Sequence, residues 1–255
     1  MQVTFAFISP DVASSRLRAE IPQRELEKLG VKRGRDILVY GKHVVSIPIA
    51  MRFGKRVYDI CDNHFHTMHE AYYRDHAALA NLITVNSEEM AKIVLYETGR
   101  VATVIPDPYE SDEQPAGYGK GVLWFGHESN LKTIEPYKHC IDVVLTHPEW
   151  TREKQLEALK DCAIVVIPTD DRKAKSANRL IEAVRNGRFV VACELPAHDE
   201  FRDFMWIGDI FEGLEWAKAH PEECINKTTL CQSYIRDKFS PERIGKMWLE
   251  TLKGI

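Results

Sequence analysis

The sequence lacks the patterns that mark secreted, membrane-spanning or disulfide-rich proteins. Its six cysteines are widely spread, and none of them forms a CxxC pair. The opening stretch MQVTFAFISPD has neither the basic start nor the long apolar run of a secretory leader. No apolar run approaches the roughly 20 residues that span a bilayer. We therefore expect a cytoplasmic protein with free, mostly buried thiols, while a peripheral membrane contact stays open.

The chain as a whole also lacks an excess of charge of either sign. Its 255 residues carry a formal net charge of −4, so bulk electrostatics favours neither nucleic acid nor membrane as a partner. Locally, residues 1–56 hold eleven Lys and Arg against five Asp and Glu, whereas residues 57–110 hold three against nine. The basic N-terminal segment is either a binding patch or an ordinary solvated surface.

Short apolar runs alternate with amphipathic stretches along almost the whole chain, which predicts an α/β protein with parallel sheets. Expected strands cover residues 3–9, 36–41, 55–62, 82–87, 101–107, 122–126, 141–146, 163–168 and 188–194. Expected helices cover residues 22–30, 44–54, 69–80, 88–99, 151–162, 175–187, 199–204, 210–220 and most of 222–255. Gly30 is expected to end the first helix, and Ser87 and Ser240 are expected to cap helices.

The stretch DPYESDEQPAGYGKG, residues 107–121, interrupts this alternation with two prolines and three glycines. We expect a linker at residues 111–121, between an N-terminal domain (1–110) and a C-terminal domain (122–240). An open parallel sheet binds ligands beyond the carboxyl ends of its strands. Two such domains would place a binding cleft between them.

The segment KSANRLIEAVRNG, residues 175–187, predicts an amphipathic helix with a cationic first turn. On a helical wheel, the polar stripe holds Lys175, Asn178, Arg179 and Glu182, opposite Ala177, Leu180, Ile181 and Val184. The macrodipole usually favours acids in a first turn, so cations beside free N–H groups indicate an anion site. Lys175 and Arg179 would bind phosphate oxygens, and Glu182 would accept from a ribose hydroxyl. The alternative is a helix that only packs on its sheet.

This segment and the residues after it resemble the donor-binding segment of GT-B glycosyltransferases of the retaining family-4 type. The family pattern is a Glu, seven residues, then Glu-Ala-x-x-x-Gly and an apolar strand. Glu182, Ala183, Gly187 and the run FVVA match its second half, whereas Ala174 stands where the first Glu belongs. The resemblance implies that Glu182 binds the ribose of a nucleotide sugar. Asp170, Asp171 or Lys175 would then take over part of the role of the missing Glu.

A second stretch, VLWFGHESNLK (122–132), resembles the family's strand-Gly-Arg-x-x-x-x-Lys loop, which approaches the donor phosphates. Gly126 and Lys132 are in place, and His127 stands at the arginine position. Glycine lets the backbone approach a phosphate closely. Lys132 would neutralise charge on the leaving diphosphate. The alternative is a simple strand-to-helix turn.

The two ends of the chain match the family more loosely. The stretch SPDVASSRLRAEIPQREL resembles a Ser/Arg-rich first loop, which makes Ser14, Ser15, Arg16 and Arg18 candidates for acceptor or phosphate contacts. A solvated basic turn is the alternative. The tail YIRDKFSPERIGKMWLETL resembles the terminal helix pair of the family, which implies that residues 241–255 pack back on the N-terminal domain.

One stretch, YDICDNHFHTMHEAYYRDH, gathers potential metal ligands: Asp59, Cys61, Asp62, Asn63, His64, His66, His69 and His76. The spacing C-x2-H-x-H-x2-H matches no standard zinc pattern, so no metal site is expected. The family resemblance implies instead that Asp62 and His64 face the cleft and contact sugar or acceptor hydroxyls. A histidine there can also shuttle a proton near neutral pH. The alternative is that these histidines cap and pack a loop.

The resulting hypothesis is an α/β, GT-B glycosyltransferase with two Rossmann-like domains that face each other across a cleft. It would be a hexosyltransferase-type enzyme without a cofactor, with a nucleotide diphosphate sugar, a UDP-sugar in the first place, as donor substrate. The family resemblance implies retention and no metal requirement. The acceptor would be a hydroxyl on a glycan, a lipid-linked molecule or a modified base in nucleic acid. A nucleotide-sugar-binding module and an epimerase of the same fold are the alternatives.

Site residues follow from this hypothesis in three groups. The proposed catalytic residues are Lys175, Lys132 and His64. The donor-binding residues are Gly126, His127, Asn130, Ser176, Asn178, Arg179 and Glu182. The acceptor-side residues are Ser14, Arg16, Arg18 and Asp62. The base, the sugar, the acceptor and the oligomeric state are not specified by the sequence.

Overall fold

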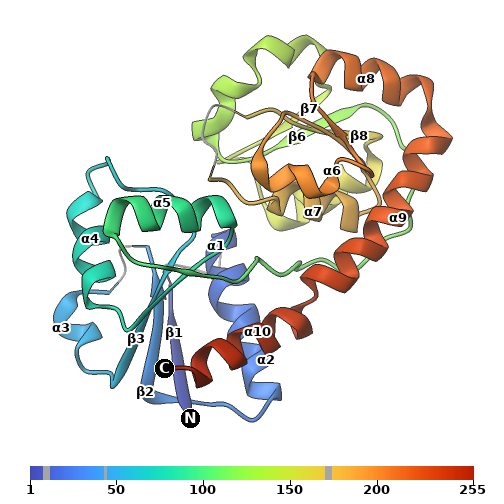
Figure 1. The fold of residues 1–255 in the computed structure, drawn as a ribbon. Helices are drawn as coiled ribbons and strands as arrows, with labels where there is room; N and C mark the ends of the chain where they lie inside the picture. Colours follow the sequence, from blue (N-terminus) through green and yellow to red (C-terminus); the bar gives the residue numbers. More distant parts are fainter. Residues whose placement is uncertain (8–11, 43–44, 170–173) are drawn as a thin grey trace. The chain divides into compact units, whose positions relative to one another are not determined.

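The computed structural model describes residues 1–7, 12–42, 45–169 and 174–255. The chain divides into two compact units, whose elements are drawn in Figure 1. The first unit comprises Met1–Glu110, Ala174–Ser176 and Lys238–Ile255, and the second comprises Ser111–Lys173 and Ala177–Asp237. Each unit contains one five-stranded sheet whose paired strands are all parallel, so the expected α/β class with two parallel sheets is confirmed.

The first sheet has its strands in chain order: β1 (Gln2–Ala6), β2 (Lys32–Gly41), β3 (Lys55–Ile60), β4 (Leu82–Val85) and β5 (Thr103–Val104). Helices connect them and close the unit: α1 (Ala13–Ser15), the π-helix η1 (Arg16–Glu20), α2 (Ile21–Lys28), α3 (Ile47–Ala50), α4 (Glu70–Leu79), α5 (Glu88–Thr98) and α10 (Pro241–Lys253). Asp170 and Asp171, which the sequence offered as substitutes for a missing Glu, lie outside the described residues.

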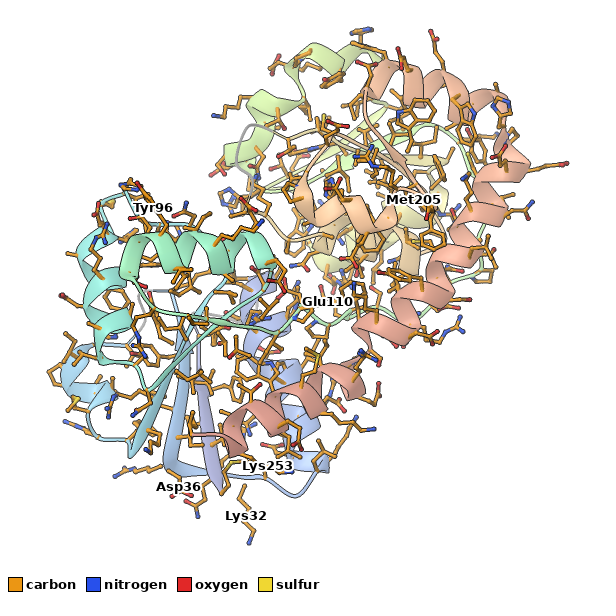
Figure 2. The ribbon with its side chains drawn as sticks, in the orientation of Figure 1. Lys32, Asp36, Tyr96, Glu110, Met205 and Lys253 are labelled. Carbon is orange, nitrogen blue, oxygen red and sulfur yellow. The ribbon has the colours of Figure 1, made fainter. Side chains whose placement is uncertain are left out.

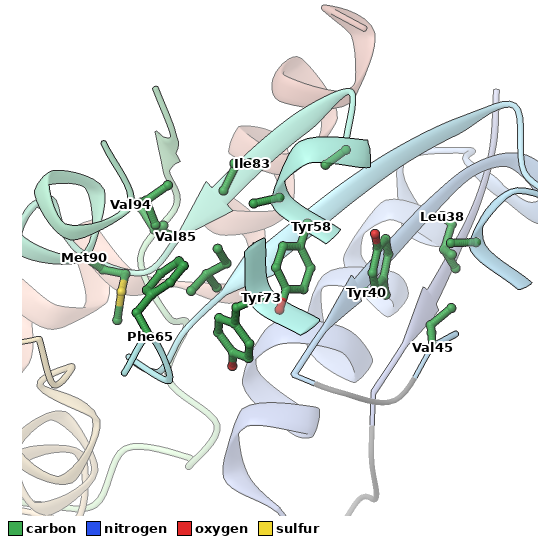
Figure 3. Close-up of a cluster of buried hydrophobic side chains, with 14 residues drawn as sticks. Leu38, Tyr40, Val45, Tyr58, Phe65, Tyr73, Ile83, Val85, Met90 and Val94 are labelled. Carbon is green, nitrogen blue, oxygen red and sulfur yellow. The ribbon is translucent and has the colours of Figure 1, made fainter. Parts of the chain in front are cut away.

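Both faces of the first sheet are covered because alternate strand residues point to opposite sides. Val39 and Val57 pack with α2 and α10, including Trp248. Tyr40 and Tyr58 lie on the other face, in the core cluster of Figure 3, where α4 and α5 supply apolar side chains. The parallel strands are therefore apolar on both faces, which explains their continuous hydrophobic runs in the sequence.

The second sheet has the order β10-β9-β8-β6-β7. Its strands are β6 (Val122–Phe125), β7 (Val143–Leu145), β8 (Ile164–Ile167), β9 (Phe189–Ala192) and β10 (Trp206–Ile207). Its helices are η2 (Glu128–Thr133), η3 (Glu135–Cys140), α6 (Arg152–Asp161), α7 (Asn178–Arg185), η4 (Pro196–Phe201), α8 (Ile210–Ala219) and most of α9 (Pro221–Phe239). The short strand β10 and the 3-10 helices η2 and η3 were not expected.

The expected linker, residues 111–121, is packed along the second unit by backbone hydrogen bonds. The N–H of Gln114 donates to the carbonyl of Arg185 at 2.8 Å, and the N–H of Gly117 donates to that of Gly187 at 3.1 Å. The side chains of Ser111, Glu113 and Tyr118 also hydrogen-bond to the second unit. Polar side chains and the backbone, rather than an apolar stripe, therefore hold the segment. It is therefore an ordered part of the second unit.

Local signals in the sequence set several helix ends. The side chain of Ser87 accepts from the N–H of Met90 at 3.2 Å, and that of Ser240 accepts from the N–H of Arg243 at 3.4 Å, so both expected caps are confirmed. Gly30 follows α2 with a φ of +84°. The helix expected from residue 22 instead begins upstream, at Ala13, and continues through η1. A π turn before Pro22 lets the helix pass a residue that has no N–H to donate.

None of the helices in the described ranges combines the length and the apolar character that membrane crossing requires.

Candidate functional site

The strand order of the second sheet reverses at β6, which lies between β7 and β8. In open parallel sheets, ligands bind beyond the carboxyl ends of the strands at such a reversal. Here that point lies beyond Phe125 and Ile167 and before α7. The first sheet has no reversal, because its strands follow one another in chain order. The second unit therefore has the stronger topological signal for a ligand site.

Gly126 lies at this reversal, directly after β6. A Cβ at this position would lie 3.0 Å from the Trp124 ring and 3.3 Å from Nη1 of Arg179. The guanidinium of Arg179 donates from Nη1 to the carbonyl of Phe125 at 3.4 Å, a long and weak hydrogen bond. The structure thus brings together two residues that the sequence singled out separately. A side chain at position 126 would push against the cation that lies beside it.

The turn after Gly126 contains three further candidate residues. His127 is exposed and caps η2, because its Nδ1 accepts from the N–H of Ser129 at 3.2 Å. Asn130 is half-buried, and its N–H donates to the carbonyl of His127 at 2.9 Å. Lys132 lies in the last turn of η2 and is exposed. The stretch after β6 is therefore a 3-10 turn, with Lys132 at its solvent side.

The helix α7 begins at Asn178, with Ala177 as the preceding cap residue. Lys175 and Ser176 therefore lie outside the helix, and they are grouped with the first unit. The expectation that Lys175 shares a helical stripe with Arg179 is wrong. The position of residues 174–176 is set by Ala174, which packs on the apolar cluster of the first unit. Arg179 is the cation that remains in the first turn of α7.

His198 is a neighbour of Arg179 that the sequence reasoning missed. It lies in η4 after β9, is 3% exposed, and its Nδ1 is 3.0 Å from the carbonyl oxygen of Cys193. Burial lowers the pKa of His198, and the positive charge of Arg179 lowers it further. A neutral imidazole therefore lies close to the guanidinium. The only sequence signal for it was its place after an apolar strand, in ELPAHDEF.

Glu182 lies deeper in α7, and its side chain is 9% exposed. Its Oε1 is 2.7 Å from Nη2 of Arg152, accepts from the hydroxyl of Ser111, and accepts from Nδ2 of Asn186 at 3.2 Å. The sequence reasoning missed Arg152 and Ser111, which lie 30 and 71 positions away along the chain. The predicted ribose ligand is thus a carboxylate held in a fixed position by the protein on its Oε1 side.

The residues predicted for the acceptor side occupy different environments in the first unit. Arg18 is 1% exposed, and its guanidinium is paired with Asp59 and Asp107 in the core. Because Arg18 is buried, its guanidinium cannot contact an acceptor as the sequence predicted, and it has a structural role instead. Arg16 pairs with Glu110, labelled in Figure 2, at 2.7 Å. The hydroxyl of Ser14 is buried and has no partner in the described part of the chain.

Asp62 lies just beyond β3 and pairs with Lys42, which follows β2, at 2.5 Å. Desolvation would raise the pKa of Asp62, but Lys42, His64 and Lys175 outweigh it, and the pKa is lowered. The structure therefore gathers Asp62 and His64, as expected, together with Lys175 and with Lys42, which was not expected. Lys42 gave no sequence signal because its partner is 20 positions away.

The histidines of residues 64–76 point to different neighbours. His76 is buried, stacks on Tyr72 at 3.9 Å, and its Nδ1 is 2.9 Å from the hydroxyl of Tyr40. His66 pairs with Glu97 at 2.7 Å. Among the described residues, no three His, Cys, Asp or Glu side chains are grouped so that they could hold a metal ion.

Structural comparison relates the chain to solved glycosyltransferases. TarM matches with a TM-score of 0.63 at 14% identity over 91% of this chain. HepE from Anabaena in complex with UDP-glucose matches with a TM-score of 0.64 at 14% identity over 96%. OtsA matches with a TM-score of 0.60 at 8% identity over 98%. The matched region covers 57% of TarM, 85% of HepE and 80% of OtsA.

No protein-family model and no curated protein sequence matches the chain. Similarity at these identities shows the fold, and it extends over both parallel sheets of the molecule. The chain therefore has the GT-B fold, which it shares with these glycosyltransferases.

Proposed function

We propose that the protein transfers a glycosyl group from a nucleotide diphosphate sugar to a hydroxyl acceptor. The observation that carries the proposal is the meeting of Gly126 and Arg179 at the strand-order reversal of the second sheet, beside the start of α7. A glycine turn, a guanidinium and the free N–H groups of a helix start are the components of a phosphate site.

The HepE structures support a nucleotide sugar as the ligand. HepE was solved with UDP and with UDP-glucose. A trehalose-6-phosphate synthase structure, matched with a TM-score of 0.58, is described as a study of glycosyltransfer with retention. On this basis we propose a UDP-hexose as donor and retention as the stereochemical outcome. From the family resemblance we further propose a reaction without a divalent metal or another cofactor.

In the proposed reaction, the bond between the anomeric carbon and the diphosphate oxygen breaks, and the acceptor oxygen takes its place. Negative charge develops on the leaving diphosphate. Arg179 and the N–H groups at the start of α7 would stabilise it, and Lys132 would screen it from the solvent side. Groups that are fixed in place before the reaction stabilise such charge without reorganisation. The proton of the acceptor hydroxyl would pass to the departing diphosphate or to a nearby base.

Glu182 would bind the ribose of the donor, as the family resemblance implies. Its Oε1 is held by Arg152 and Ser111, so the carboxylate is oriented in a nearly buried position. An oriented carboxylate can accept hydrogen bonds from the two hydroxyls of a ribose. The protein contacts of Glu182 would then position a ligand-binding group rather than replace its function.

Replacing Arg179 by glutamine should weaken nucleotide diphosphate binding and slow transfer. Loss of one charge-assisted hydrogen bond costs roughly 1.5–3 kcal/mol, and loss of one preorganised donor lowers kcat by roughly 100- to 1000-fold. Thermal unfolding with UDP, GDP and ADP measures binding, because a ligand at 100 times its Kd adds about 2.7 kcal/mol. Release of UDP from UDP-glucose measures turnover.

The matched control for this experiment is Lys154→Gln, which removes an exposed cation of α6 in the same unit. It should bind UDP as the unchanged protein does. If Arg179→Gln binds UDP and turns over like the control, the donor-site assignment is wrong. Nucleotide binding without any turnover would point to a binding module, and turnover of the donor sugar without an acceptor to an epimerase or hydrolase. A rate that falls with EDTA would contradict the metal-independent reaction.

A further inference from the structure

The eleven Lys and Arg of residues 1–56 fall into two groups in the structure. Seven of them have partners among the described residues, because six pair with carboxylates and Arg56 donates to two backbone carbonyls. The six are Arg16, Arg18, Arg24, Lys28, Arg33 and Lys42. The other four are exposed and have no ion pair within the described ranges: Lys32, Arg35, Arg52 and Lys55.

These four cations lie at one edge of the first sheet, where β2 and β3 begin, and we call them the basic edge. Lys32 is the first residue of β2, and Lys55 is the first residue of β3. The N–H of Gly54 donates to the carbonyl of Arg35 at 3.3 Å, so Arg35 lies beside the turn that contains Arg52. Figure 2 labels Lys32 at this end of the unit. The basic excess of the N-terminal segment is thus concentrated at the amino ends of two neighbouring strands.

Few acids accompany the basic edge. Asp36 is the single acid in the stretches 32–36 and 46–56. Its carboxylate accepts from the N–H of Gln2 at 2.8 Å. The edge therefore carries a net positive charge.

Two large apolar side chains are exposed beside the basic edge. Ile49, in α3, is 48% exposed, and Met51, directly after α3, is 54% exposed. The N–H of Arg52 donates to the carbonyl of Ile49 at 3.1 Å, so a tight turn joins them to the basic edge. A single exposed apolar side chain needs no explanation, but apolar side chains grouped with polar ones are typical of an interaction surface.

The kinds of surface that could meet this edge differ in what they satisfy. Water solvates the cations but not the two apolar side chains. An apolar protein partner would cover Ile49 and Met51 but would desolvate the cations. Nucleic acid offers phosphates to the cations but leaves the apolar side chains in water. A bilayer with anionic lipids satisfies both, since its headgroups attract Lys and Arg and its acyl boundary takes apolar side chains.

We propose that the basic edge, together with Ile49 and Met51, docks the first unit on the surface of a bilayer that contains anionic lipids. The headgroups would bind the four cations, and the two apolar side chains would enter the boundary between headgroups and acyl chains. Lys42 and Asp62 follow the carboxyl ends of β2 and β3, at the opposite edge of this sheet, so the bilayer would not cover them. The docking does not depend on glycosyl transfer.

Flotation with lipid vesicles in a density gradient tests the proposal, with no nucleotide present. One set of vesicles is phosphatidylcholine alone, and the other contains about 30% phosphatidylglycerol, which is anionic. The unchanged protein should partition onto the anionic vesicles at least about 10-fold more strongly, and added salt should release it. Arg52→Gln/Lys55→Gln should weaken partition by about 25-fold, since each Lys or Arg near such a surface contributes about fivefold. Ile49→Ser/Met51→Ser keeps every charge and should weaken it by about fivefold or more.

The matched control variants lie in the second unit. Lys154→Gln/Lys160→Gln removes two exposed lysines of α6 and makes the same change in net charge. Leu156→Ser/Leu230→Ser removes two exposed leucines, of α6 and α9. Both controls should partition as the unchanged protein does. The unfolding temperature of each variant without vesicles checks that its fold is kept.

Several outcomes would overturn the proposal. One is that the protein floats with neither set of vesicles, or equally with both. Another is that Arg52→Gln/Lys55→Gln partitions like the lysine control, which would mean that the basic edge is not the contact. Unchanged partition of Ile49→Ser/Met51→Ser would show a contact through charge alone. If these two apolar substitutions also leave binding of a short DNA duplex unchanged while the loss of the two cations abolishes it, the edge binds nucleic acid instead. Failure of the donor assignment would appear separately, as unchanged UDP binding in Arg179→Gln.

Discussion

Replacing Arg18 by methionine should destabilise the first unit by about 3–5 kcal/mol, the usual cost of breaking a buried ion pair by removing one partner. The guanidinium is 1% exposed and donates to both carboxylate oxygens of Asp59, at 2.9 and 2.5 Å. It also donates to Asp107 at 3.1 Å and to the carbonyl of Ile105 at 2.5 Å. Methionine fills much of the same volume, so the loss is mainly electrostatic.

The destabilisation arises because two carboxylates are left in the core without a counter-charge. Within the described residues, the side-chain hydrogen bond that Asp59 keeps is the one donated by the hydroxyl of Thr84 at 2.7 Å. Burial would lower the pKa of Arg18, but the two aspartates outweigh it and the pKa is raised, so the arginine is charged at every accessible pH. The network ties η1 to β3 and to the segment after β5. Its loss should therefore loosen the whole first sheet.

Hydrogen exchange of peptides from β3 and β4 measures this effect, because the two units need not unfold together and a single global transition could hide it. Arg33→Met is the control: its guanidinium is 72% exposed and 2.6 Å from Glu27. An exposed pair of this kind contributes about 0–1 kcal/mol. Similar exchange in the two variants would show that the Arg18 network contributes no more than a surface pair.

Arg18 also shows which features of the site could not be predicted from the sequence. The motif SSRLR contains two arginines that look alike in the sequence, yet one reaches a partially exposed glutamate and the other is buried among aspartates. Their partners lie 94, 41 and 89 positions away. Composition and spacing within a motif carry no information on such contacts. The same reason hid Arg152 and Ser111 as partners of Glu182.

Features that depend on near neighbours were predicted well. The caps at Ser87 and Ser240 involve residues three positions along, and the strand runs are apolar because both faces of each sheet are covered. The prediction that Lys175 lies on the helix was wrong for the opposite reason. The helical pattern continues through residues 175–177 in the sequence, but the position of this stretch is set by contacts of Ala174 with the first unit. Short-range chemistry therefore predicted the elements, and long-range packing decided which of the candidate residues share a site.

Replacing Gly187 by alanine should destabilise the second unit by about 2–5 kcal/mol. Gly187 follows α7 with a φ of +76°, where an L side chain costs about 1–2 kcal/mol. A Cβ there would also lie 2.1 Å from the carbonyl oxygen of Pro115, which is a backbone atom and cannot turn aside. Relief of such overpacking costs about a further 1–3 kcal/mol.

Gly99→Ala separates the two terms. Gly99 ends α5 with a φ of +68°, and a Cβ there would have no heavy atom within 4 Å. It should therefore show the conformational cost alone, about 1–2 kcal/mol. Hydrogen exchange of peptides from β9 and from β4 reports on the unit that contains each variant. An equal loss in the two variants would mean that the segment around Pro115 yields without cost.

The Gly187→Ala clash should also disturb the proposed donor site, because it displaces a segment that contacts this site. Pro115 belongs to residues 111–121, which are held on the second unit by the hydrogen bonds of Gln114 and Gly117. The same segment begins with Ser111, whose hydroxyl donates to Glu182. Moving it should therefore weaken UDP binding as well as stability, although Gly187 contacts no proposed ligand group. UDP affinity that is unchanged in a destabilised Gly187→Ala protein would show that Ser111 does not position Glu182 for the donor.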